Sequence, residues 1–365
     1  MLIRRHFLLA AATPAATTLA LTACESGPAR EQEARRIRLP VAYNDGDEAV
    51  RMRELVRFAT LAATSHNTQS WKFRLATKSI SLEVDPLRRT PVVDPDDHHL
   101  YVSLGCATEN LVHAALATGL QATSDFDPGG LGAIRVALET TKAVTSPLYQ
   151  AITQRQCTRG DYDGTSIAGA ELQLLEQAGT GPGVRVMLIT DRPSIEKTLE
   201  FVVAANSVQI NDDAFVEELK AWIRFSHDEA LRTGDGLFTG TTGNPALPRW
   251  LGSRILGVFM TPKSDSERYS RQIRSSSGLA VFVADTSDKA HWVQVGRCYQ
   301  RFALQATALG IRNAFLNQPV EVAAIRPQFA AALGLGSLRP DLVVRFGRGA
   351  TMPWSMRRPV QDVLV

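Results

Sequence analysis

Cysteine is scarce in this 365-residue chain, and its spacing argues against the sites that cysteines usually build. Four cysteines occur, and no two of them form a C-x-x-C pair. Cys24 lies near the N-terminus, which leaves an odd set of three, Cys106, Cys157 and Cys298. We therefore expect neither a disulfide framework nor a structural zinc site.

An excess of charge of one sign is also lacking. The formal net charge is +3, with 21% charged and 44% hydrophobic residues. This is the composition of a globular protein with ample length for a buried core. It offers no argument for nucleic acid or an anionic membrane surface as a partner.

The common catalytic signatures are missing as well. The chain has no G-x-G-x-x-G after a strand, no G-x-x-x-x-G-K-[ST], no H-E-x-x-H and no G-x-S-x-G. Ser65 and His66 are adjacent, which is poor geometry for a nucleophile and its base, so a serine hydrolase is not favoured. The run Asp96–His99 lacks the i, i+4 spacing of a helical zinc site, and we expect a solvated turn there and no metal.

The N-terminus has an apolar run too short for a good membrane span. Arg4 and Arg5 precede an Ala/Leu/Thr-rich stretch, which is typical of a twin-arginine export signal, and Leu21–Cys24 resembles a lipobox. We expect residues 1–24 to be this signal, with Cys24 lipidated, and residues 25–46 to be a tether. The protein would then be extracytoplasmic and membrane-anchored through that lipid alone. Because this route exports folded proteins, it favours a bound redox cofactor.

An internal duplication organises the rest of the chain. Small residues recur in two apolar helical patterns, 104–120 and 292–311, with Gly105 and Gly119 14 residues apart, as are Gly296 and Gly310. A short strand pattern precedes each helix. We predict two similar halves, 47–145 and 146–365, packed together within one chain. The Gly/Pro-rich segment 234–262 interrupts the second half and is predicted to be a lid or packed loop.

The polar stretch Ser65–Trp71 lies between a predicted helix and a predicted hairpin of 71–76 with 80–84. Carboxamides and a hydroxyl in such a loop suit the edge of a heteroaromatic ring, whereas a capped turn with a core tryptophan would use the same residues structurally. Arg155 and Arg159 are spaced to share one face at a predicted helix start and could bind phosphate, with Arg357 and Arg358 closing the site. Arginine clusters also serve as solvated charges or salt bridges.

These segments together resemble the nitroreductase superfamily, in particular its Acg-like FMN-binding branch. Residues 63–71 resemble the family's P-S-x-x-N-x-Q-P-W segment, although Thr64 and Ser70 replace prolines. Residues 155–159 resemble R-x-[ST]-x-R, with Cys157 at the Ser/Thr position, and Phe346 to Pro359 resembles G…R-R-P. The resemblance covers about Asp47 to Val363.

The resemblance implies an α+β nitroreductase-like fold, duplicated so that one chain mimics the family homodimer and can act as a monomer. It implies one FMN site, because the carboxamide loop occurs in the first half, whereas its counterpart 179–183 has no carboxamide and the arginines occur in the second half. The implied cofactor-binding residues are Ser65, His66, Asn67, Gln69, Arg155, Cys157, Arg159, Asn317, Gln318, Pro319, Arg357 and Arg358.

The implied activity is that of an FMN-dependent oxidoreductase. NAD(P)H would pass hydride through FMN N5 to a nitroaromatic, quinone or similar small acceptor, and no side chain is assigned a catalytic role. The alternatives are an FMN-sequestering protein with a lidded flavin and little NAD(P)H reactivity, and a degenerate scaffold without cofactor.

Overall fold

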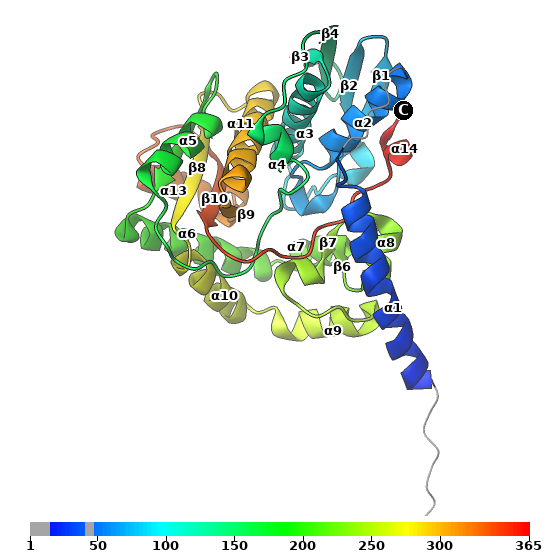
Figure 1. Ribbon diagram of the computed structural model, residues 1–365. Helices are drawn as coiled ribbons and strands as arrows, with labels where there is room; N and C mark the ends of the chain where they lie inside the picture. Colours follow the sequence, from blue (N-terminus) through cyan, green and yellow to red (C-terminus); the bar gives the residue numbers. More distant parts are fainter. Residues whose placement is uncertain (1–14, 41–46) are drawn as a thin grey trace, which may run out of the picture.

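The computed structural model, which describes residues 15–40 and 47–365, contains two halves of the same topology (Figure 1). Each half is a four-stranded antiparallel sheet with two helices, in the strand orders β1-β2-β4-β3 and β5-β8-β10-β9. The first half comprises α2 (Glu48–Thr60), β1 (Trp71–Ala76), β2 (Ser79–Val84), α3 (His98–Ala117), β3 (Leu120–Asp127) and β4 (Ala133–Thr140). The second comprises α5 (Gly169–Gly179), β5 (Val184–Ile189), β8 (Gly278–Ala284), α11 (Lys289–Ala308), β9 (Arg312–Phe315) and β10 (Pro340–Gly347). The predicted duplicated α+β fold is therefore confirmed.

The long helices α3 and α11 pack against each other at the centre of the molecule with reciprocal contacts (Figure 1). A Cβ on Gly105 would lie 2.0 Å from the carbonyl oxygen of Val293, and a Cβ on Gly296 would lie 2.0 Å from that of Val102. The two contacts are equivalent under the repeat read from the sequence. Each half therefore presents the same surface to the other, as subunits do across a two-fold axis.

Short-range sequence patterns predicted several of these helices and strands correctly. The Asp47 side chain caps α2 by accepting from the amides of Ala49 and Val50. The predicted hairpin is present, with Lys78 in its turn at φ +56°. Every residue of β8 and β10 is buried, because α11 covers one face of their sheet and the insertion covers the other.

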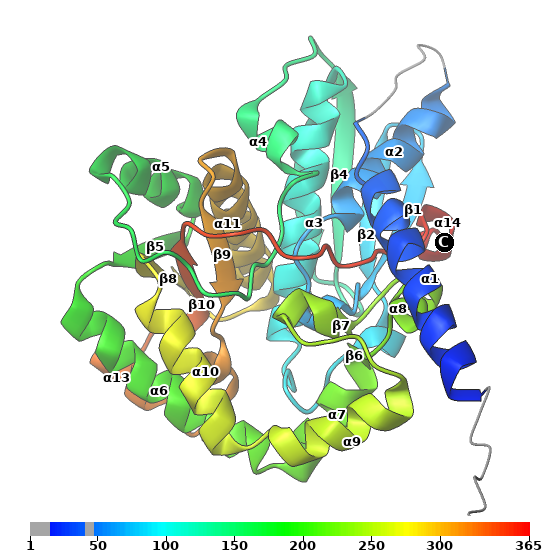
Figure 2. The same cartoon turned by 60° about the horizontal axis from the view of Figure 1, so that its bottom comes forward.

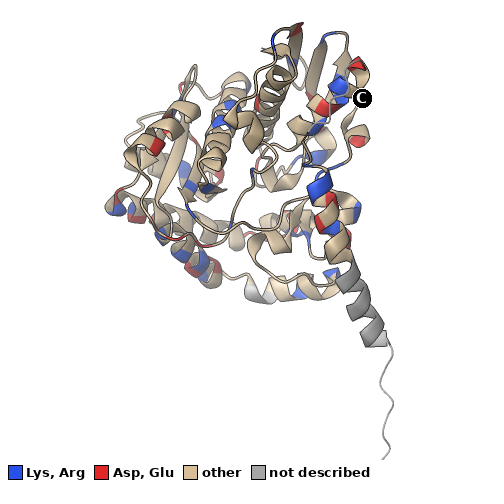
Figure 3. Ribbon diagram, viewed as in Figure 1, with Lys and Arg blue, Asp and Glu red and all other residues tan. Residues whose placement is uncertain are grey.

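A long insertion joins β5 to β8, where the first half has only a tight turn. It forms the floor of the molecule in Figure 2, where it curves below both halves. Its elements are α6 (Arg192–Ile210), α7 (Asp213–Trp222), β6 (Ile223–Arg224), α8 (His227–Thr233), β7 (Leu237–Phe238), η3 (Thr239–Thr242), α9 (Arg249–Phe259) and α10 (Pro262–Arg274). The predicted lid segment 234–262 is part of this insertion and includes helix α9. Acidic and basic residues are interspersed along α6 and α10 (Figure 3), and Arg274 pairs with Glu196 between them at 2.8 Å.

The C-terminal segment returns from the second half to the first (Figure 2). After β10 it crosses the molecule, and the amide of Val365 donates to the carbonyl oxygen of Phe73 on β1. The chain end thus ties the two sheets together. The remaining elements are η1 (Ser65–Asn67), η2 (Pro86–Arg88), α4 (Pro147–Ala151), α12 (Gln318–Glu321), α13 (Arg326–Ala332) and α14 (Val360–Val363).

Residues 25–40 of the expected tether pack against the fold, whereas its residues 41–46 lie outside the described residues. Residues 15–36 form helix α1, which packs along α8, and Arg30 and Ala34 are buried. No helix among the described residues is long and apolar enough to cross a membrane. Residues 1–14 of the expected export signal lie outside the described residues.

Candidate functional site

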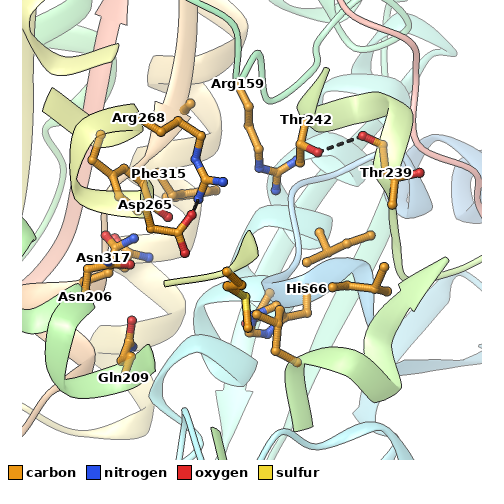
Figure 4. A pocket seen from close by; sticks show the side chains of 18 of the residues that line it. His66, Arg159, Asn206, Gln209, Thr239, Thr242, Asp265, Arg268, Phe315 and Asn317 are labelled. Carbon is orange, nitrogen blue, oxygen red and sulfur yellow. Dashed lines mark hydrogen bonds and ion pairs between the residues drawn. The ribbon is translucent and has the colours of Figure 1, made fainter. Parts of the chain in front are cut away.

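Two connected cavities lie between the halves and the insertion. The larger has a volume of about 600 Å³ and is walled by η1, the start of α3, β9 and the insertion helices. The smaller, of about 50 Å³, lies toward the C-terminal segment and contains four arginines, three of them buried. Arg159, Thr64 and Phe315 line both, so the two spaces adjoin. Figure 4 shows Arg159 and His66 facing the larger cavity from opposite sides.

The smaller cavity, called here the arginine pocket, gathers Arg38, Arg155 and Arg357. Each is less than 8% exposed. Among the described residues, no Asp or Glu lines the pocket. Burial of three like charges without a counter-charge is costly and leaves an environment that attracts an anion.

The hydrogen bonds of these arginines leave capacity inside the pocket. Arg357 donates to the carbonyl oxygens of Thr60 and Ala62 and to Oδ1 of Asn67. Arg155 donates from Nη2 to Leu61 O, whereas its buried Nε and Nη1 have no partner in the described part of the chain. Unsatisfied donors on a buried guanidinium are groups to which the oxygens of a bound anion could supply acceptors.

The lowered pKa values of two of these arginines also indicate an anion site. Burial, followed by the charges of Arg155 and Arg30, lowers the pKa of Arg38 to about 9. Burial, with Arg38 and Arg155, holds the pKa of Arg357 well below its usual range. The three cations destabilise one another, and a bound anion would relieve that repulsion.

The predicted helix start at Arg155 is wrong. Helix α4 ends at Ala151, and residues 155–159 are irregular apart from the bridge of Cys157 with Asn313. Arg155, Cys157 and Arg159 nevertheless converge, because all three line the arginine pocket. Arg159 has no side-chain partner among the described residues. Cys157 lines the arginine pocket.

The carboxamide loop has an unusual backbone and serves mainly to hold other segments. His66, Asn67 and Gln69 have φ of +46°, +53° and +53°. Asn67 Nδ2 donates to the carbonyl oxygens of Gly236 and Met356. Gln69 Nε2 donates to Gly234 O, and its Oε1 accepts from the amide of Arg358. Neither carboxamide lines the larger cavity, and Asn67 borders only the arginine pocket.

Ser65 and His66 do line the larger cavity. His66 is half-buried, and its Nδ1 is buried with no partner among the described residues. Burial, followed by the charge of Arg159, lowers its pKa to about 4. The imidazole is therefore neutral near pH 7 and offers one donor and one acceptor to a ligand.

The segment after β9 contributes two of its three predicted residues. Asn317 and Gln318 line the larger cavity, but Pro319 does not. Gln318 Oε1 is buried without a partner in the described chain. Arg358 lies outside both cavities, 3.6 Å from Asp85, so of the two terminal arginines only Arg357 reaches the site.

The run Asp96–His99 forms the expected solvated turn only in part, since Asp96 is exposed in a turn but the two histidines are not. His98 and His99 are buried at the start of α3, because Asp94 accepts from the amides of His99 and Leu100 and anchors this end of the helix. Asp97 is the residue that precedes the helix, with φ +59°.

Asp94, His98 and His99 converge closely enough to raise the question of a metal. Asn317 Oδ1 accepts from the amide of Val343, so its Nδ2 donates to His99 Nε2 at 3.0 Å. The proton of neutral His99 is therefore on Nδ1, the atom that would have to bind the metal. This favours a hydrogen-bond network over a metal site.

The sequence patterns did not predict Arg38 or the polar residues of the insertion as residues of the site. Asn206, Gln209, Asp265 and Arg268 face the larger cavity (Figure 4). Nothing local marks them, because α6 and α10 look like ordinary surface helices in sequence. Arg38 was assigned to a tether, although the charge-rich helical pattern from Arg30 to Arg38 could have predicted a packed helix.

Comparison with known proteins adds independent evidence. No family model matches the chain. Over 340 residues it is 23% identical to two Mycobacterium tuberculosis proteins that carry the provisional name NAD(P)H nitroreductase, covering 89% of this chain and 94% of theirs. A Bacteroides fragilis nitroreductase with bound FMN aligns with 59% of this chain and 96% of its own, at 16% identity and a TM-score of 0.37. The FMN-dependent nitroreductase NfnB of Mycobacterium smegmatis, solved with NADPH, aligns with 56% and 87%, at 14% identity and a TM-score of 0.37. The chain is thus similar over most of its length to these two curated relatives.

Proposed function

We propose that this chain is an FMN-binding oxidoreductase of nitroreductase type, from the Acg-like branch, with its single flavin site formed between its two halves. The observation that carries the proposal is the arginine pocket beside the larger cavity. A buried cluster of unneutralised guanidinium groups suits a phosphate monoester, and the adjoining 600 Å³ suits the ring system attached to it. The names of the curated relatives point the same way.

The donor set fits FMN in both parts. Arg155 and Arg357, together with the adjacent Arg159, would hold the phosphate. Neutral His66 and the unpartnered Gln318 Oε1 would meet the polar edge of the ring, and Phe315 would supply an apolar wall. Bound FMN would supply hydride transfer through N5 between NAD(P)H and a nitroaromatic, quinone or similar acceptor. The side chains would bind, orient and exclude water.

Flavin uptake followed by anaerobic reduction tests this proposal. Purified protein should bind FMN. The absorbance of the bound flavin should bleach on addition of NADPH or NADH and should recover when a quinone is added. Riboflavin, which has the ring without the phosphate, should bind much more weakly. Protein that takes up neither flavin would contradict the proposal.

A second candidate, an FMN-sequestering protein, is favoured by the insertion. Helices α6, α9 and α10 wall the larger cavity, so access for a nicotinamide donor depends on that segment. Dithionite is small and should reduce the flavin in either case. Bleaching by dithionite but not by NADPH would indicate sequestration. Replacing residues 244–260 by a Gly/Ser linker of equal length should then restore reduction by NADPH.

We also propose export by the twin-arginine route with lipidation of Cys24. The support is the pair Arg4 and Arg5 and the lipobox-like Leu21–Cys24. Intact-mass analysis of the membrane fraction would test it, since the mature chain would begin at a diacylated Cys24. A soluble product that retains residues 1–24 would contradict it.

A further inference from the structure

The segment that precedes the first half is seated against the arginine pocket. Arg30 Nη1 donates to Trp354 O at 2.9 Å, and the guanidinium lies 4.6 Å from the centre of the Phe238 ring. Ala34 is buried in a small apolar cluster with Phe238 and Met356. Residues 30–38 therefore pack against both the insertion and the C-terminal segment.

Arg38 is the point at which this segment enters the pocket. Its Nη1 donates to Ala34 O at the end of α1, and its Nη2 donates to Ser355 O at 2.9 Å. The guanidinium also lies 5.4 Å from the Trp354 ring. Only 7% of Arg38 is exposed, and its bonds within the described chain are to neutral carbonyl oxygens. Its charge is uncompensated.

We infer that Arg38 is a fourth arginine of the anion site, beside Arg155, Arg159 and Arg357, and that the docking of residues 26–38 is coupled to the occupancy of that site. Arg38 lines the same cavity as Arg155 and Arg357 and is held there against their repulsion. An anion between them removes that repulsion only when Arg38 is docked. By thermodynamic linkage, the bound anion stabilises the docked segment, and the docked segment increases the affinity for the anion by the same free energy.

The ligand chemistry is that of a phosphate group, and its identification as the phosphate of FMN rests on the proposed function. Lipidation at Cys24 would leave residues 26–38 on the mature protein, so the docking segment would persist after processing. The N-terminal segment is then part of the cofactor site rather than a spacer.

Two variants of the full chain test this inference. Arg38→Gln should weaken FMN binding by roughly 10- to 100-fold, measured by flavin fluorescence, and should leave the weaker riboflavin binding unchanged. Arg35→Gln is the matched control, because Arg35 is exposed on the same helix end and pairs with Glu31. It should bind FMN as the wild type does.

Hydrogen exchange supplies a readout that does not depend on activity. FMN should slow exchange in residues 26–40 of the wild type and of Arg35→Gln, but not of Arg38→Gln. Equal FMN affinity in Arg38→Gln and wild type, with equal protection of the segment, would overturn the inference.

Inorganic phosphate separates this inference from the proposed function. If the wild type binds no flavin but phosphate still protects residues 26–40 in an Arg38-dependent manner, the anion site stands and the flavin assignment fails. If neither FMN nor phosphate protects the segment, the inference fails.

Discussion

At the scale of single residues, the site is defined by polar groups that the fold buries without satisfying them. His66, Arg155 and Gln318 each hold at least one buried polar atom with no partner in the described chain. Native proteins satisfy most such groups. Three of them around adjoining cavities therefore mark the place where a ligand would complete the hydrogen bonding.

His66 should make the stability of the protein sensitive to acid. Its pKa is about 4 in the folded protein against 6.5 for an ordinary histidine. Between these values the unfolded chain binds a proton and the folded chain does not, so this contribution to stability is lost as pH falls from 6.5 toward 4. We expect a loss of about 3 kcal/mol, relative to a variant without the imidazole, in urea denaturation of the ligand-free protein.

His66→Asn is the suitable comparison, because asparagine tolerates the positive φ at this position. The difference in unfolding free energy between the two proteins should change over this pH range. A constant difference would show that His66 does not titrate as its burial implies.

Arg155 is expected to lower the stability of the ligand-free protein and to strengthen the binding of FMN. Arg155→Met removes a buried, uncompensated charge, so the ligand-free variant should melt about 2–5 °C higher than wild type. Its FMN affinity should fall roughly 100-fold, because the donors toward the phosphate are lost. Differential scanning fluorimetry and flavin fluorescence would measure the two effects.

Arg358→Met is the control for Arg155, since Arg358 lies outside the pocket and near Asp85. Its FMN affinity should equal that of the wild type. A destabilised Arg155→Met that retains full FMN affinity would contradict the anion site.

At the scale of elements, the loop Ser65–Trp71 acts as a junction, that is, it hydrogen-bonds segments that are distant in sequence, in addition to bordering the site. Asn67 and Gln69 bond the backbone of two segments distant in sequence, around 234–236 and 356–358. Their φ values require residues that tolerate the left-handed region. The loop therefore positions the insertion and Arg357, which borders the site.

Asn67→Ala should weaken both binding and folding for this reason. The substitution removes two donated bonds and the acceptor of Arg357 Nη1, and it places alanine at φ +53°. We expect a loss of about 2–4 kcal/mol in unfolding free energy, measured by urea denaturation.

Asn244→Ala serves as its control, because Asn244 is exposed and its side chain bonds only to Thr242 in the described chain. That variant should lie within about 0.5 kcal/mol of wild type. If Asn67→Ala were equally neutral, the loop would not act as a junction.

At the scale of the whole molecule, the two halves depend on the close approach of α3 and α11. Glu109 on α3 bonds Arg297 and Arg301 on α11, and Asn110 accepts from Gln300. These buried polar contacts and the reciprocal glycine contacts fix the register of one half on the other. Since the site lies between the halves, its geometry follows from this register.

Gly105→Ala should disrupt that packing. The added Cβ would meet the Val293 carbonyl oxygen at 2.0 Å, and a backbone atom can move only if the helices separate. We expect a loss of more than about 4 kcal/mol, or no soluble protein, judged by expression and thermal melting. Gly257→Ala, in helix α9 with open space at its Cβ, should be neutral or stabilising by about 1 kcal/mol. Equal stability of the two variants would refute the tight packing.

The sequence by itself determined the local elements and the duplication. The hairpin of β1 and β2, the helices around Gly105 and Gly296 and the cap at Asp47 follow from periodicity and turn chemistry, which act over a few residues. The convergence of Arg155 and Arg159 was also predicted, although the backbone that achieves it is not helical, because Cys157 between them pairs with Asn313.

Only the tertiary structure decided which side chains face the larger cavity and the arginine pocket. Arg38, Arg155 and Arg357 come from three distant segments, and nothing local to Arg38 indicates its partners. The same packing turned Asn67 and Gln69 toward backbone groups and enclosed His98 and His99. Burial and partnership are properties of long-range contacts, so a single sequence could predict the residue types of this site but not their final roles.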